Sequence, residues 1–264
     1  MKKLLPLLLF LIYSLTFPTL SYAQENTPLQ GTWKLVKSKW GKMKKLQTPT
    51  QSIYKIFTKK HFYFIYYDNE EFSGAGGGTY TIDEQTFTET LDYFSWDSTA
   101  TKTNQTYNWT IEGNILHQSG FIKGTDEYDD YIIEEYYEKV EEDASLNESL
   151  TGVWQIEKGT YGDETNTAEE NRWTIRKIFT PTFWYAAFYD ARSGSFNGIG
   201  FGTYKLKQNQ YIETLSAYSW DQSAVGKTYT FTMDIQPETL IQSGMINSDK
   251  YKDYKIEEYF KRVE

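Results

Sequence analysis

Two lysines and two glutamates are the residues of this chain best placed to form a polar site inside a folded core. Lys55 lies in the run Ile-Tyr-Lys-Ile-Phe, and Glu89 lies in the run Phe-Thr-Glu-Thr-Leu. Lys177 and Glu213 occupy matching positions in the second half of the chain. Because residues two apart face the same side of a β-strand, each charge is predicted to point the same way as its apolar neighbours.

Such an ammonium–carboxylate pair could anchor the polar part of a small ligand in an otherwise apolar cavity. Two alternatives fit the same pattern: a buried pair that only completes a core, or an outward face that has aromatic residues of its own. An unpaired buried charge is costly, and pairing is the usual remedy. The sequence therefore predicts that Lys55 contacts Glu89 and that Lys177 contacts Glu213 across an interior.

Aromatic residues complete the candidate ligand-lining set. Trp96 and Trp220 each lie in a Ser-Trp-Asp tripeptide that ends a predicted strand. An exposed tryptophan there could stack on a sugar or another flat ligand, or it could close one end of the fold while the aspartate starts a turn. Tyr80 and Tyr204, which follow two glycine-rich segments, are the other candidates.

Nothing in the sequence favours a catalytic or metal site. His61 and His117 are the two histidines, and their counterparts in the second half are Phe183 and Ile241, which cannot bind a metal or transfer protons. There is no cysteine, and metal sites need several convergent ligands. We expect no catalytic residues, no metal and no cofactor.

The whole chain is one unit written twice. The segment Glu-Thr-Leu-Asp-Tyr-Phe-Ser-Trp-Asp at 89–97 returns as Glu-Thr-Leu-Ser-Ala-Tyr-Ser-Trp-Asp at 213–221. Domains are predicted over residues 27–141 and 150–264, joined by an acidic linker at 142–149.

Each copy carries about eight short segments with strand patterning, which is typical of a sandwich or a closed barrel. A closed barrel hides both sheet edges, and this suits a chain in which 18% of the residues are aromatic. The strands predicted in the first copy cover residues 29–36, 53–58, 62–68, 74–80, 86–97, 105–111, 114–121 and 131–141.

Glycines alternate in the fourth strand of each copy, at residues 74, 76 and 78 and at residues 198, 200 and 202. A phosphate-binding loop would have to open a helix, whereas here another strand follows. Alternating glycine instead predicts a bare strand face, for a bend or for a closely packed neighbour.

The opening strands carry a family resemblance. Trp33 and Trp154 each lie in a Gly-x-Trp motif that resembles the first strand of calycins, the superfamily of lipocalins and fatty-acid-binding proteins. Those families close the barrel with a basic residue over this tryptophan, which implies that Lys139 covers Trp33 and Arg262 covers Trp154. The duplicated chain also resembles secreted lipocalin-like domains of Gram-negative bacteria. The implied fold is all-β, with two tandem antiparallel lipocalin-like β-barrels.

The stretch after each first strand lacks clean alternation and is predicted to be a long loop with room for a helical turn. In calycin-type barrels this stretch overhangs one mouth. It carries five lysines in the first copy and four acids in the second. The mouths are therefore expected to differ in charge, either because the two loops meet at a domain interface or because the barrels admit different ligands.

Residues 1–23 have the pattern of a secretory signal, with Lys2 and Lys3 before a short apolar run and a cleavage site after Ala23. The protein is thus expected to be secreted or periplasmic, with no membrane span once the signal is removed. A net charge of −9 argues against nucleic acid and anionic membranes as partners.

The function predicted from these features is that of an exported, non-catalytic binding protein for a small, partly hydrophobic ligand. The alternative is an interaction module, in which barrels filled with side chains contact a protein or an envelope glycan. An empty cavity would favour the first prediction, and a filled core would favour the second.

Overall fold

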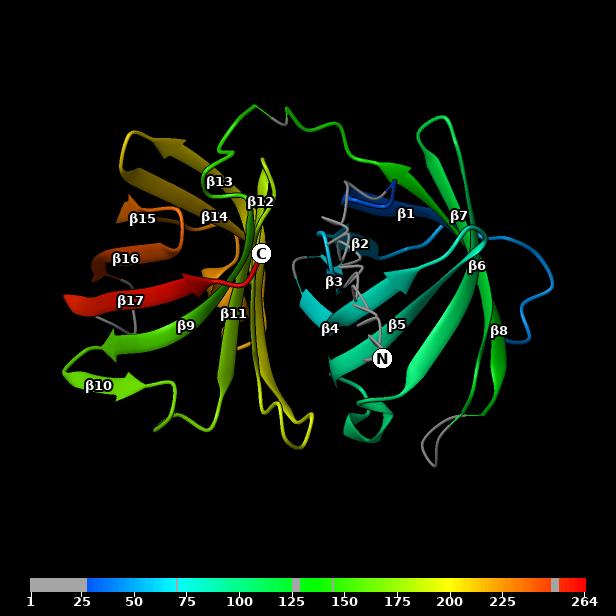
Figure 1. Ribbon diagram of the computed structural model, residues 1–264, viewed down its shortest axis with the longest axis horizontal. Helices are drawn as coiled ribbons and strands as arrows, with labels where there is room; N and C mark the ends of the chain where they lie inside the picture. The colour runs from blue at the N-terminus through cyan, green and yellow to red at the C-terminus, as the bar shows by residue number, and fades with distance from the viewer. Residues whose placement is uncertain (1–27, 70, 125–128, 144, 248–251) are drawn as a thin grey trace, which may run out of the picture.

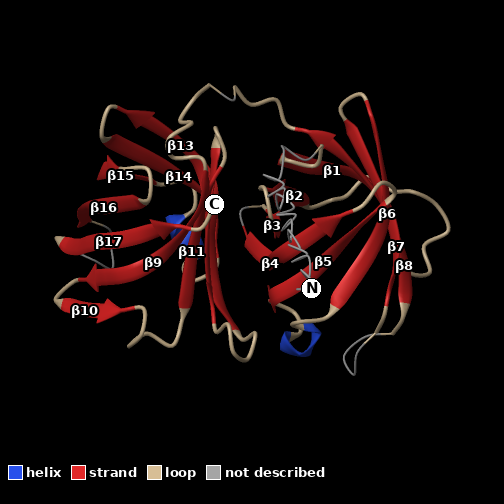
Figure 2. Cartoon of the chain, viewed as in Figure 1, coloured by secondary structure: helices blue, strands red, loops and turns tan. Residues whose placement is uncertain are grey.

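The computed structural model describes residues 28–69, 71–124, 129–143, 145–247 and 252–264. Within these ranges the chain forms two antiparallel β-barrels that lie side by side along the long axis (Figure 1). Two single-turn 3₁₀ helices, η1 (Ser98–Ala100) and η2 (Gln222–Ala224), are the only helices in this part of the chain (Figure 2). None is long and apolar enough to cross a membrane. The predicted signal segment lies outside the described residues.

The first barrel has eight strands and closes by pairing of its first strand with its last. Each of the eight strands predicted from the sequence is present. They are β1 (Gly31–Trp40), β2 (Ser52–Phe57), β3 (His61–Asp68), β4 (Glu71–Ile82), β5 (Thr86–Phe94), β6 (Asn104–Glu112), β7 (Ile115–Ile122) and β8 (Tyr131–Lys139).

The second barrel repeats this order, closes by pairing of β9 with β17, and adds a short hairpin strand, β10. Its strands are β9 (Gly152–Tyr161), β10 (Glu164–Thr167), β11 (Thr174–Phe179), β12 (Phe183–Tyr189), β13 (Phe196–Lys207), β14 (Gln210–Tyr218), β15 (Thr228–Ile235), β16 (Thr239–Ile246) and β17 (Tyr254–Arg262). The predicted all-β, tandem lipocalin-like fold is confirmed.

The predicted loop after the first strand is partly wrong. β1 continues to Trp40 and β9 continues to Tyr161, and no helical turn follows either strand in the described residues. A β-bulge explains the missed strand ends, because the pairing of β1 with β8 shifts between Leu35 and Lys37. A bulge inserts one residue and reverses the strand parity beyond it, so the sequence shows no continuous alternation.

The two charged stretches lie at opposite ends of the long axis, one next to β10 and the other between β1 and β2 (Figure 1). The expectation that they meet at a domain interface is therefore wrong. The first stretch leaves the barrel at Trp40, and Lys42, Lys44 and Lys45 are exposed. Lys39, in contrast, lies in β1 and pairs with Glu134 at 2.8 Å.

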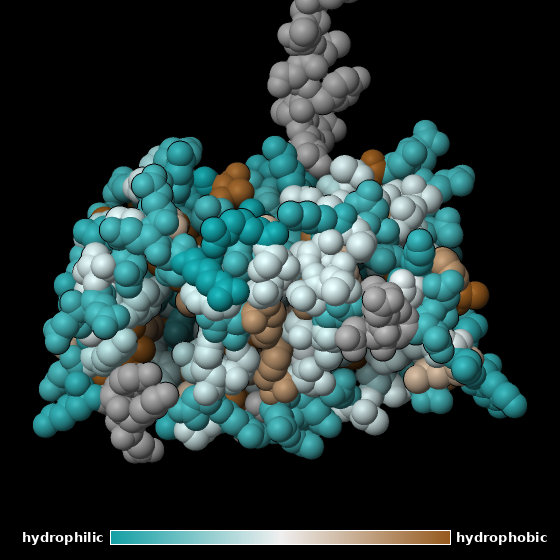
Figure 3. Space-filling view, turned by 90° about the horizontal axis from the view of Figure 1, so that it is seen from below, coloured by the Kyte–Doolittle hydropathy of each residue, from teal (hydrophilic) through white to brown (hydrophobic). Residues whose placement is uncertain are grey.

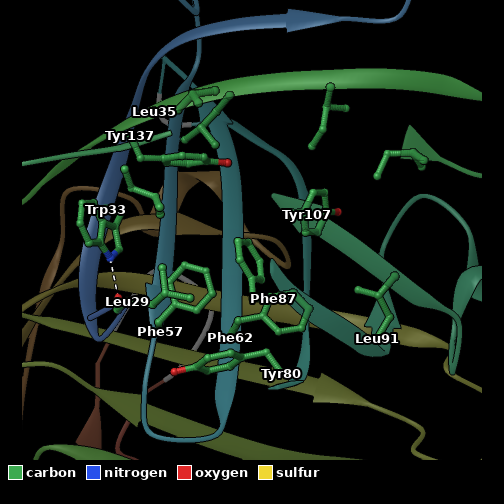
Figure 4. Packing of buried hydrophobic residues seen from close by; sticks show 14 of the residues in the cluster. Leu29, Trp33, Leu35, Phe57, Phe62, Tyr80, Phe87, Leu91, Tyr107 and Tyr137 are labelled. Carbon is green, nitrogen blue, oxygen red and sulfur yellow. Dashed lines mark hydrogen bonds between the residues drawn. The ribbon is translucent and has the colours of Figure 1, made fainter. Parts of the chain in front are cut away.

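Each barrel has its own core, closed at one end by the Gly-x-Trp tryptophan. Trp33 is 1% exposed, and its indole N–H donates to the carbonyl of Leu29 at 2.7 Å (Figure 4). Trp154 donates to Leu150 in the same way, at 2.8 Å. Because a leucine from the segment before the strand plugs this end, side chains fill that half of the barrel.

The structure brings together the cation and ring pairs that the calycin resemblance implies. Lys139 Nζ lies 5.3 Å from the ring centroid of Trp33. Arg262 Cζ lies 4.0 Å from the ring centroid of Trp154, and Nη1 of this arginine donates to the carbonyl of Thr151 at 3.0 Å. A basic side chain from the last strand of each barrel thus covers the tryptophan of the first strand.

A third buried cluster joins the barrels. It consists of side chains on the outer faces of β2–β5, β9 and β11–β14. Tyr63 packs on its counterpart Tyr185, with ring centroids 5.4 Å apart, and Phe72 stacks on its counterpart Phe196 at 5.7 Å. Contacts between equivalent positions are the signature of an approximate two-fold axis, so the chain resembles a homodimer joined by a linker.

Candidate functional site

Each barrel contains a cavity between its tryptophan-closed end and the opposite rim. The volume is about 380 Å³ in the first barrel and about 490 Å³ in the second. Aromatic side chains are the most numerous class of lining residue in both. The surface seen from below is mostly hydrophilic and is hollowed in the half formed by the second barrel (Figure 3). Such volumes are in the range of small-molecule sites.

A buried ion pair lies at the inner wall of each cavity. Lys55 Nζ is 2.6 Å from Glu89 Oε1, and the two side chains are 4% and 5% exposed. Lys177 Nζ is 3.5 Å from Glu213 Oε2 in the second barrel. The predicted pairing is confirmed in both copies. The pairs arise because β2 and β5, like β11 and β14, point these side chains inward from opposite walls of the barrel.

Aromatic rings enclose each lysine. Lys55 Nζ lies 5.3–5.9 Å from the centroids of five rings, and Lys177 Nζ lies 5.1–5.7 Å from three. The rings around Lys55 are those of Phe57, Phe62, Phe87, Tyr107 and Tyr137. An ammonium over aromatic faces is attracted by the ring quadrupole, which helps to offset its loss of water.

The sequence reasoning missed the rest of this polar network in the first barrel. Lys55 Nζ donates to Gln118 Oε1 at 3.1 Å, and Gln118 Nε2 donates to Glu135 Oε2 at 2.6 Å. Glu135 also accepts from Tyr137 at 3.1 Å and from the indole N–H of Trp40 at 2.7 Å. Five strands thus contribute to one connected buried group.

The second barrel has the equivalent residues. Lys177 donates to Gln242 Oε1 at 2.6 Å, and Tyr161 donates to Glu258 Oε1 at 2.9 Å. A signal for these residues was present in the sequence, because Gln-Ser-Gly and Glu-Glu-Tyr occur in the last two strands of both copies. Like the two lysines, these residues lie two positions from apolar residues on the same strand face.

The cavities are acidic. Among the described residues that line them, the charged ones are Lys55, Glu89 and Glu135 in the first barrel, and one lysine and two glutamates in the second. Burial raises the pKa of Glu89, and the nearby Lys55 only partly offsets this effect. Burial likewise raises the pKa of Glu258. By composition, each lining holds one more carboxyl group than it has ammonium groups.

Tryptophans form the rim. Trp96 is 48% exposed and Trp220 is 40% exposed, and each lines its cavity. Trp96 Nε1 donates to the carbonyl of Ser73 at 3.0 Å. A Cβ atom on Gly74 would lie 1.8 Å from the Trp96 ring. The alternating glycines therefore let aromatic rings lie flat on the strand, as the close-neighbour interpretation predicts.

The aspartate of each Ser-Trp-Asp tripeptide starts a turn, as one of the two alternatives predicted. Asp97 Oδ1 accepts from the backbone N–H of Thr99 at 2.8 Å, and Asp221 Oδ1 accepts from that of Ser223 at 3.0 Å. These caps begin η1 and η2. Each cap fixes the direction in which the chain leaves the rim.

Tyr80 and Tyr204 lie outside the lining of both cavities. The hydroxyl of Tyr80 donates to the carbonyl of Thr58 at 2.8 Å, and that of Tyr204 donates to the carbonyl of Thr180 at 2.7 Å. Both side chains point into the barrel, as predicted, but they lie at its filled end. Ligand binding by either tyrosine stays a prediction.

The histidines lie outside the cavities. His61 Nδ1 is 3.3 Å from Glu264 Oε1, where the two barrels meet. His117 stacks on Tyr136 on the outside of the first barrel, with ring centroids 4.5 Å apart. No group of three or more histidine, aspartate or glutamate side chains in the described part of the chain could hold a metal ion.

The topology, the cavities and the closing strands define two lipocalin-like barrels in one chain. The family model described as "Domain of unknown function (DUF4488)" matches residues 28–147 and again residues 149–264. The chain belongs to this family and carries its domain twice.

Several solved structures are similar. A lipocalin-like protein from Bacteroides uniformis is 18% identical over 44% of this chain and 99% of its own, with a TM-score of 0.30. An uncharacterized protein from Bacteroides eggerthii is 19% identical over 43% and 98%, also with a TM-score of 0.30. An uncharacterized protein from Saccharomyces cerevisiae is 10% identical over 89% and 98%, with a TM-score of 0.48. A search of curated proteins gives no match.

Proposed function

We propose that this protein is an exported, non-catalytic binding protein that holds a small, partly hydrophobic molecule in each barrel. The observation that carries the proposal is the cavity in each barrel, with the same buried polar group at its inner wall. An aromatic wall with a few fixed polar groups is the usual composition of a small-molecule site. The alternative of filled barrels is disfavoured, because it leaves such cavities unexplained.

The proposed ligand-binding residues act at two depths. Lys55 and Glu89, with their counterparts Lys177 and Glu213, orient the polar end of the ligand at the inner wall. Trp96 and Trp220 cover its apolar body at the rim. Export is proposed from the sequence of residues 1–23 alone.

Native mass spectrometry of the protein purified from its own host tests the proposal. We expect masses above that of the processed chain, and we expect the extra mass to disappear on denaturation. Ala186→Phe narrows the second cavity: Ala186 lines it, and the counterpart in the first barrel is Phe64. It should weaken retention of the ligand in the second barrel and leave the ligand of the first barrel in place. A native mass equal to that of the bare chain, in protein that also binds no small molecule added to it, would refute the proposed function.

A further inference from the structure

We propose that both cavities select organic cations, such as protonated amines on an apolar body, over carboxylates. This inference rests on the proposed function and names the chemical class of its ligand. It follows from the balance of charges, the unused hydrogen-bonding capacity and the aromatic walls of the cavities.

The charge balance is the same in both barrels. One lysine faces two glutamates in each cavity, and the other described lining residues are uncharged. With both glutamates ionised, a ligand cation would bring the lining to neutrality, whereas a ligand carboxylate would add a third negative group. Charges buried in a protein interior need partners, so the excess carboxylate favours a cation.

Unused hydrogen-bonding capacity in the first cavity points the same way. Glu89 Oε1 is buried and lies 2.6 Å from Lys55 Nζ, which also donates to Gln118 Oε1. An ionised carboxylate offers about four acceptor positions, so a ligand ammonium could share Glu89 with Lys55.

The lysine is poorly available to an anion. Glu89 and Gln118 already contact its ammonium group, and five aromatic rings surround it. A carboxylate ligand would have to displace these partners. It would also have to approach Glu89 and Glu135, which face the same cavity.

The walls suit a cation with an apolar body. Trp96 stands edge-on to Tyr66 and Phe94, with ring centroids 5.1 Å apart in both cases. Phe188 and Tyr218 pack on Trp220 in the second barrel, each at 4.9 Å. Aromatic rings attract cations through their faces and pack well on apolar groups, so the same walls serve both parts of such a ligand.

A matched series of three probes tests the inference by isothermal titration calorimetry: 3-phenylpropylamine, 3-phenylpropanol and 3-phenylpropanoate. They share one apolar body and differ in charge. We expect the amine to bind at least about tenfold more tightly than the alcohol, which is the worth of a charge-assisted hydrogen bond. The carboxylate should bind most weakly.

Two variants and two controls locate the effect. Glu89→Gln and Glu213→Gln keep the side-chain shape and neutralise the lining, so each should remove the preference for the amine in its own barrel. Glu134→Gln and Glu257→Gln remove the same charge from the outside of the barrels and should preserve the preference. Circular dichroism checks that all four variants are folded.

The wild-type titrations decide the matter even if a variant does not fold. Binding of the alcohol or the carboxylate as tightly as the amine would overturn the cation inference and leave the proposed function standing. Binding of none of the three at about 1 mM would overturn both, since cavities of this kind should hold such a probe at that concentration.

Discussion

The interiors of the two barrels are alike, whereas the outer faces on which the barrels meet differ. Inside, the same lysine, two glutamates and glutamine recur at matching positions. Outside, Asp92 of the first barrel pairs with Arg176 of the second at 2.9 Å, while their own counterparts are Ser216 and Tyr54. The two interiors therefore share one polar group, whereas the contacting faces carry opposite charges at this point.

The cavities differ in shape around the shared polar group. Phe64 narrows the first cavity where Ala186 leaves room in the second. Trp184, whose counterpart is Phe62, adds a buried indole N–H that has no hydrogen-bond partner among the described residues. Trp173, from the stretch after β10, also lines the second cavity. The two barrels should thus bind the same chemical group on bodies of different size.

The largest expected effect comes from removing the buried lysine of either barrel. Lys55→Met should lower the free energy of unfolding by about 3–5 kcal/mol, because it leaves two buried carboxylates without a cation. Lys177→Met should do the same in the second barrel. Urea unfolding measures both losses, with the exposed Lys59→Met as control. A loss below about 1 kcal/mol would mean that the carboxyl groups are neutral in the folded state.

The interface should keep the halves together after the linker is cut. Each copy is predicted to be a separately folded domain, so limited proteolysis should cut first within residues 142–149 and leave two stable fragments. We expect these fragments to co-elute in size-exclusion chromatography.

Tyr93→Ala tests the same interface. Tyr93 is buried and its hydroxyl lies 2.6 Å from that of Tyr185, so its loss should cost about 3 kcal/mol and separate the fragments. The exposed Phe121→Ala is the control. Fragments that unfold, or early cutting at other sites, would argue against independent domains.

Exchanging the residues that set cavity size should exchange the preferences of the barrels. Phe64→Ala should improve binding of a bulkier amine to the first barrel by about tenfold, and Ala186→Phe should weaken it in the second by a similar factor. Calorimetry with amines of increasing ring size measures the change. Equal affinity profiles before and after exchange would show that these positions do not control size.

Amine binding should weaken progressively as the pH falls from about 8 to about 5. Burial raises the pKa of Glu89 despite Lys55, and Glu135 raises it further. The carboxylate that attracts the amine is thus charged above this raised pKa and becomes neutral as the pH falls through it. The same titration on Glu89→Gln serves as control and should be flat for the first barrel. A pH-independent wild type would contradict the expectation.

The smallest effect concerns the exposed lysines after β1. Changing Lys42, Lys44 and Lys45 to glutamate should strengthen amine binding to the first barrel by about two- to threefold at low salt, and the gain should vanish at high salt. Domain association should be unchanged, because the segment between β1 and β2 lies on the side of the first barrel away from the second (Figure 1). Identical binding at low salt would show that the loop is only solvated.

Most strands, and the direction in which their side chains face, can be predicted from the sequence. Alternation of apolar residues depends only on neighbours along the chain, and its recurrence in both copies argues against chance. This was enough to predict the pairing of Lys55 with Glu89 and of Lys177 with Glu213. The same alternation marks Gln118 and Glu135 in the last two strands of the first barrel.

The depth of each side chain in its barrel, and what covers the outer faces, cannot be predicted from local patterns. Tyr80 and Glu89 are paired neighbours on adjacent strands and both point inward, yet one lies at the filled end and the other lines the cavity. Depth along a barrel depends on the stagger of all its strands. The contact of Asp92 with Arg176 depends on how two closed barrels pack, which no local pattern encodes.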